Sequence, residues 1–167
     1  MNSLLKKEIL TDYKNNFMLR AIEKSEQNFL SGKGGPFGAV IVRDGEIVAV
    51  AGNCVTSTND PTAHAEVMAI REACKTLNTF DLSGCEIYAS CEPCPMCLGA
   101  IMWARIDQLY YAADRNDAAR AGFDDEVFYS ELALPNDQRM LKPTQILQDK
   151  AVKVFDKWID TTDKTSY

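Results

Sequence analysis

At 167 residues, the chain has the length of one domain and can bury a hydrophobic core. Hydrophobic residues make up 46% and charged residues 25%, which is ordinary for a globular protein, and no apolar run is long enough to span a membrane. The formal net charge of -6 argues against a nucleic-acid partner, because a phosphate-binding surface requires Lys and Arg.

The N-terminal residues carry no apolar stretch of signal-peptide length, which predicts a cytoplasmic location. Disulfides are uncommon in that reducing compartment, so the six cysteines need another explanation. Three of them, Cys91, Cys94 and Cys97, lie within seven consecutive residues, and such a cluster indicates metal binding or catalysis. We expect the three scattered cysteines to be small buried hydrophobic residues.

The first half of the chain predicts a helix followed by a β-hairpin. Apolar residues at helical spacing predict a helix over residues 12–30, which the glycines after it would end. Two runs rich in β-branched residues follow, over 39–43 and 46–50. Asp44 and Gly45 between them are typical of a two-residue hairpin turn.

The second half predicts alternating helices and strands. Asp60 and Pro61 indicate the start of a helix, with the aspartate as cap and the proline in the first turn. Strand, short helix and strand follow in an order that implies a parallel crossover, so the class is α/β with a mixed central sheet covered by helices. The elements after the Asp60 helix are a strand over 85–90, a helix over 95–105, a strand over 107–112 and a last helix over 149–159.

The chemistry is concentrated in two short motifs, His64-Ala65-Glu66 and the Pro93–Cys97 segment. A catalytic zinc takes three protein ligands and keeps its fourth position for water. His64 is the only histidine in the chain, so one histidine with two cysteines is the sole mixed set available. Cys94 and Cys97 are three residues apart at a predicted helix start, where such side chains are neighbours. We therefore predict that His64, Cys94 and Cys97 bind Zn²⁺.

Glu66 is the predicted proton carrier. His64 and Glu66, two residues apart, can serve one site only at a helix end, so two helix N-termini should converge on the metal and favour thiolates there. Zinc lowers the pKa of bound water and creates a nucleophile, and an uncoordinated carboxylate beside it can move the protons.

A closed structural zinc site is the alternative interpretation of the same residues. Cys91, together with His64, Cys94 and Cys97, would supply the four ligands of such a site. Glu66 would then have no reason to lie beside the metal. We therefore expect Cys91 to be a residue at a strand end that lines or supports the site.

Longer stretches resemble a known family. Residues 62–66 and 90–97 are similar to the cytidine deaminase superfamily, which shares the H-x-E and P-C-x-x-C motifs. Within it, residues 34–40, 59–66 and 121–125 resemble the small bacterial guanine deaminases. The similarity extends from about residue 17 to the C-terminus and is weakest between residues 131 and 148.

The resemblance implies a fold, a reaction and an assembly. The implied fold is a three-layer α/β/α domain over residues 1–167 with a central mixed five-stranded sheet. The implied reaction is hydrolysis of the small purine guanine to xanthine and ammonia in purine catabolism or salvage, with a zinc-bound hydroxide attacking the ring carbon. The implied assembly is a homodimer in which a C-terminal helix and tail, residues 149–167, cover an active site.

The resemblance also assigns roles to further residues. Asn53 and Phe37 would contact the purine, and Asp125 would be a second acidic group near the leaving amine. Trp103 and Tyr167 would be further substrate contacts. From the residues alone, Asn53 is also typical of a turn, Phe37 of a core aromatic and Asp125 of a solvated acidic face. A polar tail such as the one that ends in Tyr167 would normally fray.

Other functions remain open from the sequence. Guanosine, cytosine or another aminopurine would suit the same motifs, and plant guanosine deaminases look similar. A tRNA adenosine deaminase shares the zinc motifs, but it requires a basic surface and an extruded base. A binding module with structural zinc is the alternative that is not an enzyme.

Overall fold

The computed structural model describes the backbone of residues 3–165 and the side chains of residues 12–165. The chain divides into two compact units, Met1–Phe128 and Tyr129–Tyr167, and each is described by itself. No helix in the part of the chain described is long and apolar enough to cross a membrane. The interpretation of residues 1–167 as a single deaminase domain stays a prediction.

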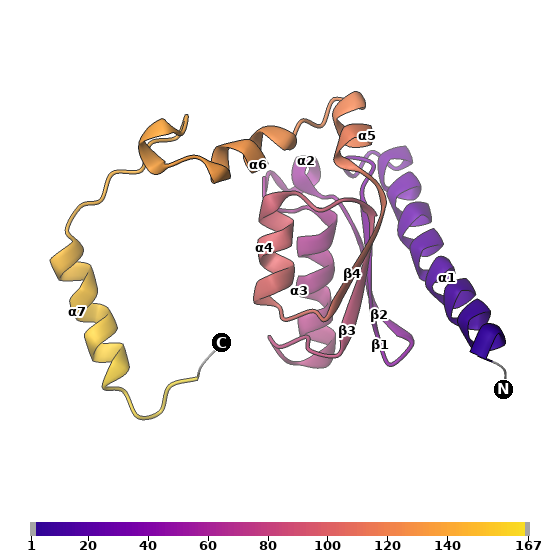
Figure 1. Ribbon diagram of the computed structural model, residues 1–167, viewed down its shortest axis with the longest axis horizontal. Helices are drawn as coiled ribbons and strands as arrows, with labels where there is room; N and C mark the ends of the chain where they lie inside the picture. The colour runs from indigo at the N-terminus through magenta and orange to yellow at the C-terminus, as the bar shows by residue number, and fades with distance from the viewer. Residues whose placement is uncertain (1–2, 166–167) are drawn as a thin grey trace. The chain divides into compact units, whose positions relative to one another are not determined.

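The first unit is built on a mixed sheet whose strands lie in the order β2-β1-β3-β4 (Figure 1). The strands are β1 (Gly38–Arg43), β2 (Glu46–Gly52), β3 (Cys85–Cys91) and β4 (Gln108–Ala113). β1 pairs antiparallel with both β2 and β3, whereas β3 and β4 are parallel. The predicted hairpin is confirmed, because Asp44 and Gly45 both have positive φ angles, of 50° and 81°, as a type I′ turn requires.

The expectation of five strands is wrong: the sheet has four strands among residues 3–165. After β4 the chain enters α5 (Arg115–Arg120), where Asp114 accepts a hydrogen bond from the backbone N–H of Asp117 and forms a capping box. Residues 114–147 contain no run of four β-branched or aromatic residues that would favour a further strand. The elements that follow are α6 (Glu126–Ala133), the 3₁₀ turn η1 (Asn136–Gln138) and α7 (Gln148–Ile159).

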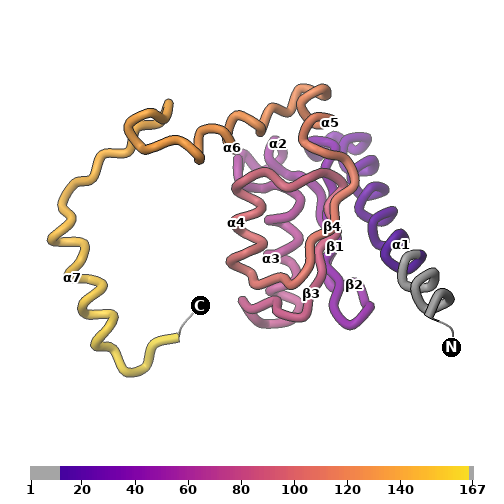
Figure 2. Tube along the Cα trace, in the orientation of Figure 1, coloured from indigo at the N-terminus to yellow at the C-terminus, as the bar shows by residue number. Residues whose placement is uncertain are grey.

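Helices cover both faces of the sheet, which confirms the three-layer α/β/α arrangement (Figures 1 and 2). α1 (Ser3–Leu30), longer than predicted, packs on one face, and α3 (Ala65–Leu77) with α4 (Pro95–Trp103) covers the other. The alternation of side chains along β1 divides the core in two, because successive residues of a strand point to opposite faces. Val40 and Val42 pack with α1, while Ala39 and Ile41 pack in the cluster that contains α3.

The predicted start of the second long helix is wrong by several residues. The Asp60 carboxylate accepts hydrogen bonds from the Thr62 backbone N–H at 2.8 Å and hydroxyl at 2.6 Å, so Asp60 closes a turn and does not cap a helix. α3 begins at Ala65 instead, with His64 as its N-cap in extended conformation. The helix therefore begins at the motif itself.

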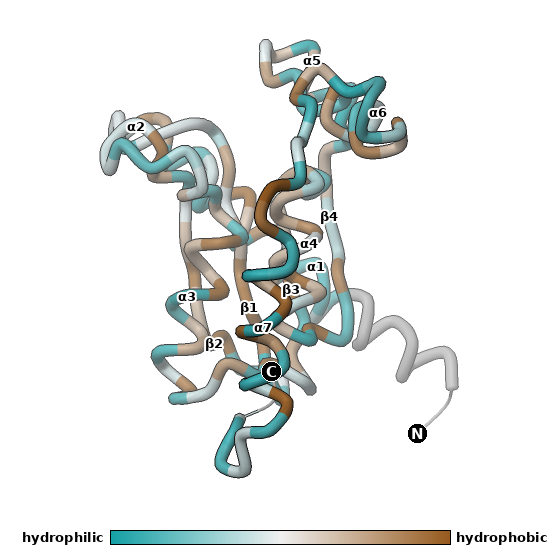
Figure 3. The backbone as a smooth tube through the Cα atoms, turned by 90° about the vertical axis from the view of Figure 1, so that its left-hand side faces the viewer, coloured by the Kyte–Doolittle hydropathy of each residue, from teal (hydrophilic) through white to brown (hydrophobic). Residues whose placement is uncertain are grey.

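α7 of the second unit is amphipathic, because Val152, Phe155 and Ile159 recur at helical spacing with charged residues between them. Hydrophobic and hydrophilic residues are both visible along it in Figure 3. Its prediction over residues 149–159 is confirmed to within one residue. The large apolar side chains that it exposes are Val152, Val154, Phe155, Trp158 and Ile159.

Candidate metal and substrate site

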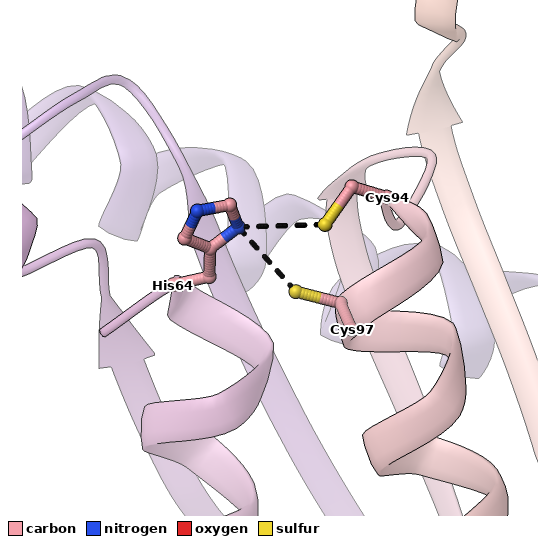
Figure 4. A group of neighbouring side chains, drawn as sticks. All are labelled: His64, Cys94 and Cys97. Carbon is pink, nitrogen blue, oxygen red and sulfur yellow. Dashed lines mark hydrogen bonds between the residues drawn. The ribbon is translucent and has the colours of Figure 1, made fainter. Parts of the chain in front are cut away.

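Three potential metal ligands meet where two helices begin (Figure 4). His64 is the N-cap of α3, Cys94 is the N-cap of α4, and Cys97 lies in the first turn of α4. The His64 Nδ1 atom lies 3.6 Å from the Cys94 Sγ and 3.5 Å from the Cys97 Sγ. All three candidate ligand atoms lie within 4.8 Å of one another.

These distances fit a tetrahedral zinc ion. Zn–N bonds near 2.0–2.1 Å and Zn–S bonds near 2.3 Å, at tetrahedral angles, separate nitrogen from sulfur by roughly 3.5–3.6 Å. The observed separations are 3.5 and 3.6 Å. His64 would therefore bind through Nδ1, with both thiolates completing a set of three protein ligands.

The helix starts favour negative charge at this point. Neither the His64 nor the Cys94 side chain accepts a capping hydrogen bond. The partial positive charge of the first N–H groups of both helices therefore favours anionic groups at the site. Pro95 at the first position of α4 has no N–H and fixes the helical backbone there. Cys94 and Cys97 thus lie at the positive end of the α4 dipole, and His64 lies at the positive end of the α3 dipole.

The two cysteines influence each other's pKa. A hydrogen bond with the Cys97 thiol lowers the pKa of Cys94 to about 4, with a further contribution from His64. The hydrogen bond with Cys94 also raises the pKa of His64. The lowered pKa of Cys94 favours its thiolate form, which is the form that binds metals.

Glu66 lies beside this group without belonging to it. Its side chain is 8% exposed, and the Cys97 thiol donates a hydrogen bond to its Oε2 atom at 3.5 Å. Burial raises the pKa of Glu66 above its usual value. A carboxylate with a raised pKa is suited to accept and return protons near neutral pH.

A cavity of about 320 Å³ opens in front of these residues. His64, Glu66 and Cys94 form its chemically reactive wall. The volume lies in the range of sites for small ligands, and the lining is mostly apolar with a few polar groups. The other lining residues are Gly35, Phe37, Asn53, Val55, Thr56, Cys91, Glu92, Ala118, Phe123, Asp124, Asp125 and Phe128.

Asn53 and Phe37, to which the family resemblance gives substrate contacts, both line this cavity. The Asn53 Oδ1 atom accepts hydrogen bonds from the N–H groups of Val55 at 3.2 Å and Gly35 at 3.4 Å. These two bonds orient the carboxamide through its oxygen atom. The Phe37 ring packs edge-to-face with Phe123, with ring centroids 4.8 Å apart.

Asp125 also lines the cavity, and its Oδ1 atom is buried without a hydrogen-bond partner among the described residues. Burial raises the pKa of this carboxyl group. A buried acceptor without a donor is costly unless a ligand or water satisfies it. Asp125 thus has the chemistry of a group that accepts a hydrogen bond from a substrate.

The structure does not bring every predicted residue to the cavity. Trp103 is the last residue of α4, is 68% exposed, and is not part of the lining. Within this chain it therefore lies apart from the predicted purine site. Tyr167 lies outside the described residues. Cys91 is the last residue of β3 and lines the cavity without joining the metal group, as predicted.

Sequence reasoning assigned no side-chain role to Phe123 or Phe128 and missed an ion pair near the candidate metal ligands. The Glu92 carboxylate accepts hydrogen bonds from the Arg115 guanidinium on both oxygens and from the Arg115 backbone N–H at 3.2 Å. This contact ties the loop before Cys94 to the start of α5. Glu92 stood within the motif, but no sequence signal identified a partner 23 residues away.

Comparison with known proteins extends these observations over most of the chain. Residues 11–113 match the cytidine and deoxycytidylate deaminase zinc-binding region. The chain is 49% identical over 151 residues to a guanine deaminase from Bacillus subtilis (strain 168), covering 90% of this chain and 97% of the relative. The X-ray structure of guanine deaminase from Bacillus subtilis matches with a TM-score of 0.89 and 48% identity, over 92% of this chain and 98% of that one. A tRNA-specific adenosine deaminase from Aquifex aeolicus (strain VF5) is 45% identical over 100 residues, covering 60% of this chain and 66% of the relative.

Proposed function

Because this chain belongs to the cytidine and deoxycytidylate deaminase zinc-binding family, we propose that it is a zinc-dependent guanine deaminase. In this reaction guanine and water give xanthine and ammonia. The observation that carries the proposal is the extent of similarity. The guanine deaminase relative is matched over 97% of its length, whereas the tRNA deaminase relative is matched over 66%.

The segment after the family region supports a free base as substrate. The family match ends at residue 113, and the cavity wall beyond it is formed by α5 and the residues that follow. There Phe123 supplies an aromatic wall and Asp125 supplies a buried acceptor. The net charge of -6 further disfavours a polyanionic substrate such as tRNA.

The polar groups of the cavity complement guanine. The Asn53 NH₂ group would donate to an acceptor of the base, such as its carbonyl oxygen. The Asp125 Oδ1 atom would accept from an N–H of the amine on the reacting carbon. Phe37 would pack against the flat face of the base and exclude water from it.

His64, Cys94 and Cys97 would hold the metal, and Glu66 would move the protons. When bound, zinc lowers the pKa of a coordinated water so that a hydroxide nucleophile is available near neutral pH. Glu66 takes the proton released by the water and passes it to a ring nitrogen as the new C–O bond forms. Glu66 then takes the proton of the new hydroxyl group and delivers it to the amine. The C–N bond breaks, ammonia leaves and the ring keeps the oxygen.

An ammonia-release assay tests this proposal against its alternatives. Guanine, guanosine, adenine, cytosine, cytidine and tRNA are compared, each with and without a zinc chelator. Guanine should be hydrolysed fastest, and the chelator should abolish the activity. Faster ammonia release from guanosine than from guanine would favour a guanosine deaminase. Salt-dependent binding and deamination of tRNA would favour a tRNA adenosine deaminase.

We further infer a homodimer in which residues 149–167 of one copy cover the active site of the other. Support comes from apolar side chains exposed on α4, including Met96 and Met102, and from the apolar residues exposed on α7. Large exposed apolar patches mark interaction surfaces. A cytoplasmic location suits this enzyme, because the two cysteine ligands must stay reduced.

A further inference from the structure

We propose that Asn28 is a positioning residue that holds the two chain segments of the purine-binding wall in register. Asn28 lies near the end of α1, on a helix that contributes none of the residues lining the cavity. Its side chain is nevertheless only 3% exposed, which is unusual for asparagine. A buried amide of this kind has to be satisfied, and its partners identify its role.

Both amide hydrogens of the Asn28 side chain form hydrogen bonds with residues that line the cavity. Its Nδ2 atom donates to the backbone carbonyl of Asn53 at 2.8 Å and to the backbone carbonyl of Gly35 at 2.9 Å. Gly35 and Asn53 both line the cavity, and they belong to segments 18 residues apart. One nitrogen atom therefore bridges the loop before β1 and the end of β2.

The same two segments are tied together by backbone hydrogen bonds. The Asn53 N–H donates to the Phe37 carbonyl at 3.1 Å, and the Phe37 N–H donates to the Gly35 carbonyl at 2.8 Å. The Gly35 N–H approaches the Asn53 Oδ1 atom at 3.4 Å. Asn28 thus completes a network whose members are the residues that would stack on the base and donate to it.

The network leaves no space for another side chain. A Cβ atom on Gly34 would lie 2.2 Å from the Asn53 carbonyl oxygen, and one on Gly52 would lie 2.4 Å from the Asn28 Oδ1 atom. Glycine is therefore required at both positions by the close approach of the chain. Without the Asn28 amide, the two carbonyls would have to turn toward water, which would displace Phe37 and Asn53.

Loss of Asn28 should weaken binding of the substrate more than the chemical step. The candidate metal ligands and Glu66 are positioned by α3 and α4, which cover the opposite face of the sheet from α1. Asn53 and Phe37 would contact the base both before and during the reaction. Removal of such uniform binding raises KM and leaves kcat nearly unchanged.

The experiment uses two variants and a control matched for burial. Asn28→Ala removes the amide, and Asn28→Asp keeps its shape but removes the donors. Leu82→Ala is the control, because Leu82 is fully buried in the core and does not line the cavity. We expect both Asn28 variants to raise KM for guanine about tenfold with kcat within about threefold, since small displacements of a binding group have effects of this order. Leu82→Ala should change neither value by more than about twofold.

Two further readouts do not depend on turnover. The zinc content of the Asn28 variants should equal that of the parent chain. Combining each Asn28 variant with Glu66→Gln should weaken equilibrium binding of guanine about tenfold, measured by calorimetry against Glu66→Gln alone. An unchanged KM and affinity, or an equal change in Leu82→Ala, would overturn the inference.

Because the substrate in these assays rests on the proposed function, amide hydrogen exchange provides a separate test. Residues 34–37 and 53–55 should exchange faster in Asn28→Ala than in the parent or in Leu82→Ala. If the parent chain does not hydrolyse guanine, the proposed function fails, and the exchange result still decides the role of Asn28. Unchanged protection of both segments would refute that role whatever the substrate is.

Discussion

The ion pair between Arg115 and Glu92 should be a measurable source of stability. Arg115→Met removes both guanidinium hydrogen bonds to the Glu92 carboxylate but keeps the length of the side chain. The backbone N–H at position 115 still donates to that carboxylate at 3.2 Å. The variant therefore isolates the contribution of the guanidinium.

The magnitude follows from the burial of the pair. The side chains of Arg115 and Glu92 are 33% and 17% exposed, which places the pair between the surface and buried cases. Exposed pairs contribute about 0–1 kcal/mol, and breaking a buried pair costs about 3–5 kcal/mol. We therefore expect Arg115→Met to lower the free energy of unfolding by about 2 kcal/mol. For a chain of this length, that corresponds to a Tm lower by about 4–8 °C.

Arg120→Met is the matched control for this experiment. Arg120 pairs with Asp117 at 3.1 Å on the same helix, but the two side chains are 82% and 46% exposed. Its loss should change the free energy of unfolding by no more than about 0.5 kcal/mol. Urea unfolding of the zinc-loaded proteins measures both variants. Equal destabilisation by the two substitutions would refute the argument from burial.

Four further predictions follow from the site and its supports. Glu66→Gln should keep its zinc and its fold but reduce kcat at least about 100-fold, and activity within tenfold of the parent would remove Glu66 as proton carrier. Cys97→Ala should lose zinc and ammonia release together, as measured by metal analysis after dialysis; a fully loaded variant would contradict its role as ligand. The hydrogen bond from the backbone N–H of Asp117 lowers the pKa of Asp114, so the ionised cap stabilises the folded chain above the unfolded pKa, and this stabilisation is lost as the pH falls through the folded pKa. Asp114→Asn should therefore show a smaller loss of Tm on acidification than the parent. An identical dependence of Tm on pH would exclude this contribution. Deleting residues 158–167 should reduce activity far more than Tm. If the tail acts on the partner, mixing the truncated chain with full-length Glu66→Gln should restore activity. No recovery of activity in such heterodimers would argue that the tail acts within its own chain.

Short-range patterns predicted the parts of the molecule that neighbouring residues control. The Asp44-Gly45 turn was correct because a two-residue hairpin depends on the backbone freedom of its own residues. The metal group was predicted as well, because only one histidine exists and the cysteines share a helix turn. The predicted start of α3 was wrong, because the Asp60 carboxylate can accept hydrogen bonds either as a helix cap or within a turn. In the structure it accepts one from the backbone N–H of Thr62 in a turn.

Tertiary contacts decided what the patterns left open. The count of strands was wrong because resemblance suggested a fifth strand that the residues after β4 do not favour. Asn28 and Arg115 carried no sequence signal, because each acts on a segment far away along the chain. Trp103 matched the family pattern, yet its position at the end of α4 separates it from the cavity of its own chain.

The residue types by themselves therefore determined the chemistry of this protein: two thiols, one imidazole and one carboxylate in motifs that suit an open zinc site. The folded chain decided where that chemistry can act, by joining two helix starts at the distances that a tetrahedral ion requires. It also built the cavity wall from the segment before β1, the segment after β2, and residues in and after α5. The physical reason is that ligand identity is a property of single side chains, whereas a cavity exists only when segments distant in sequence are packed together.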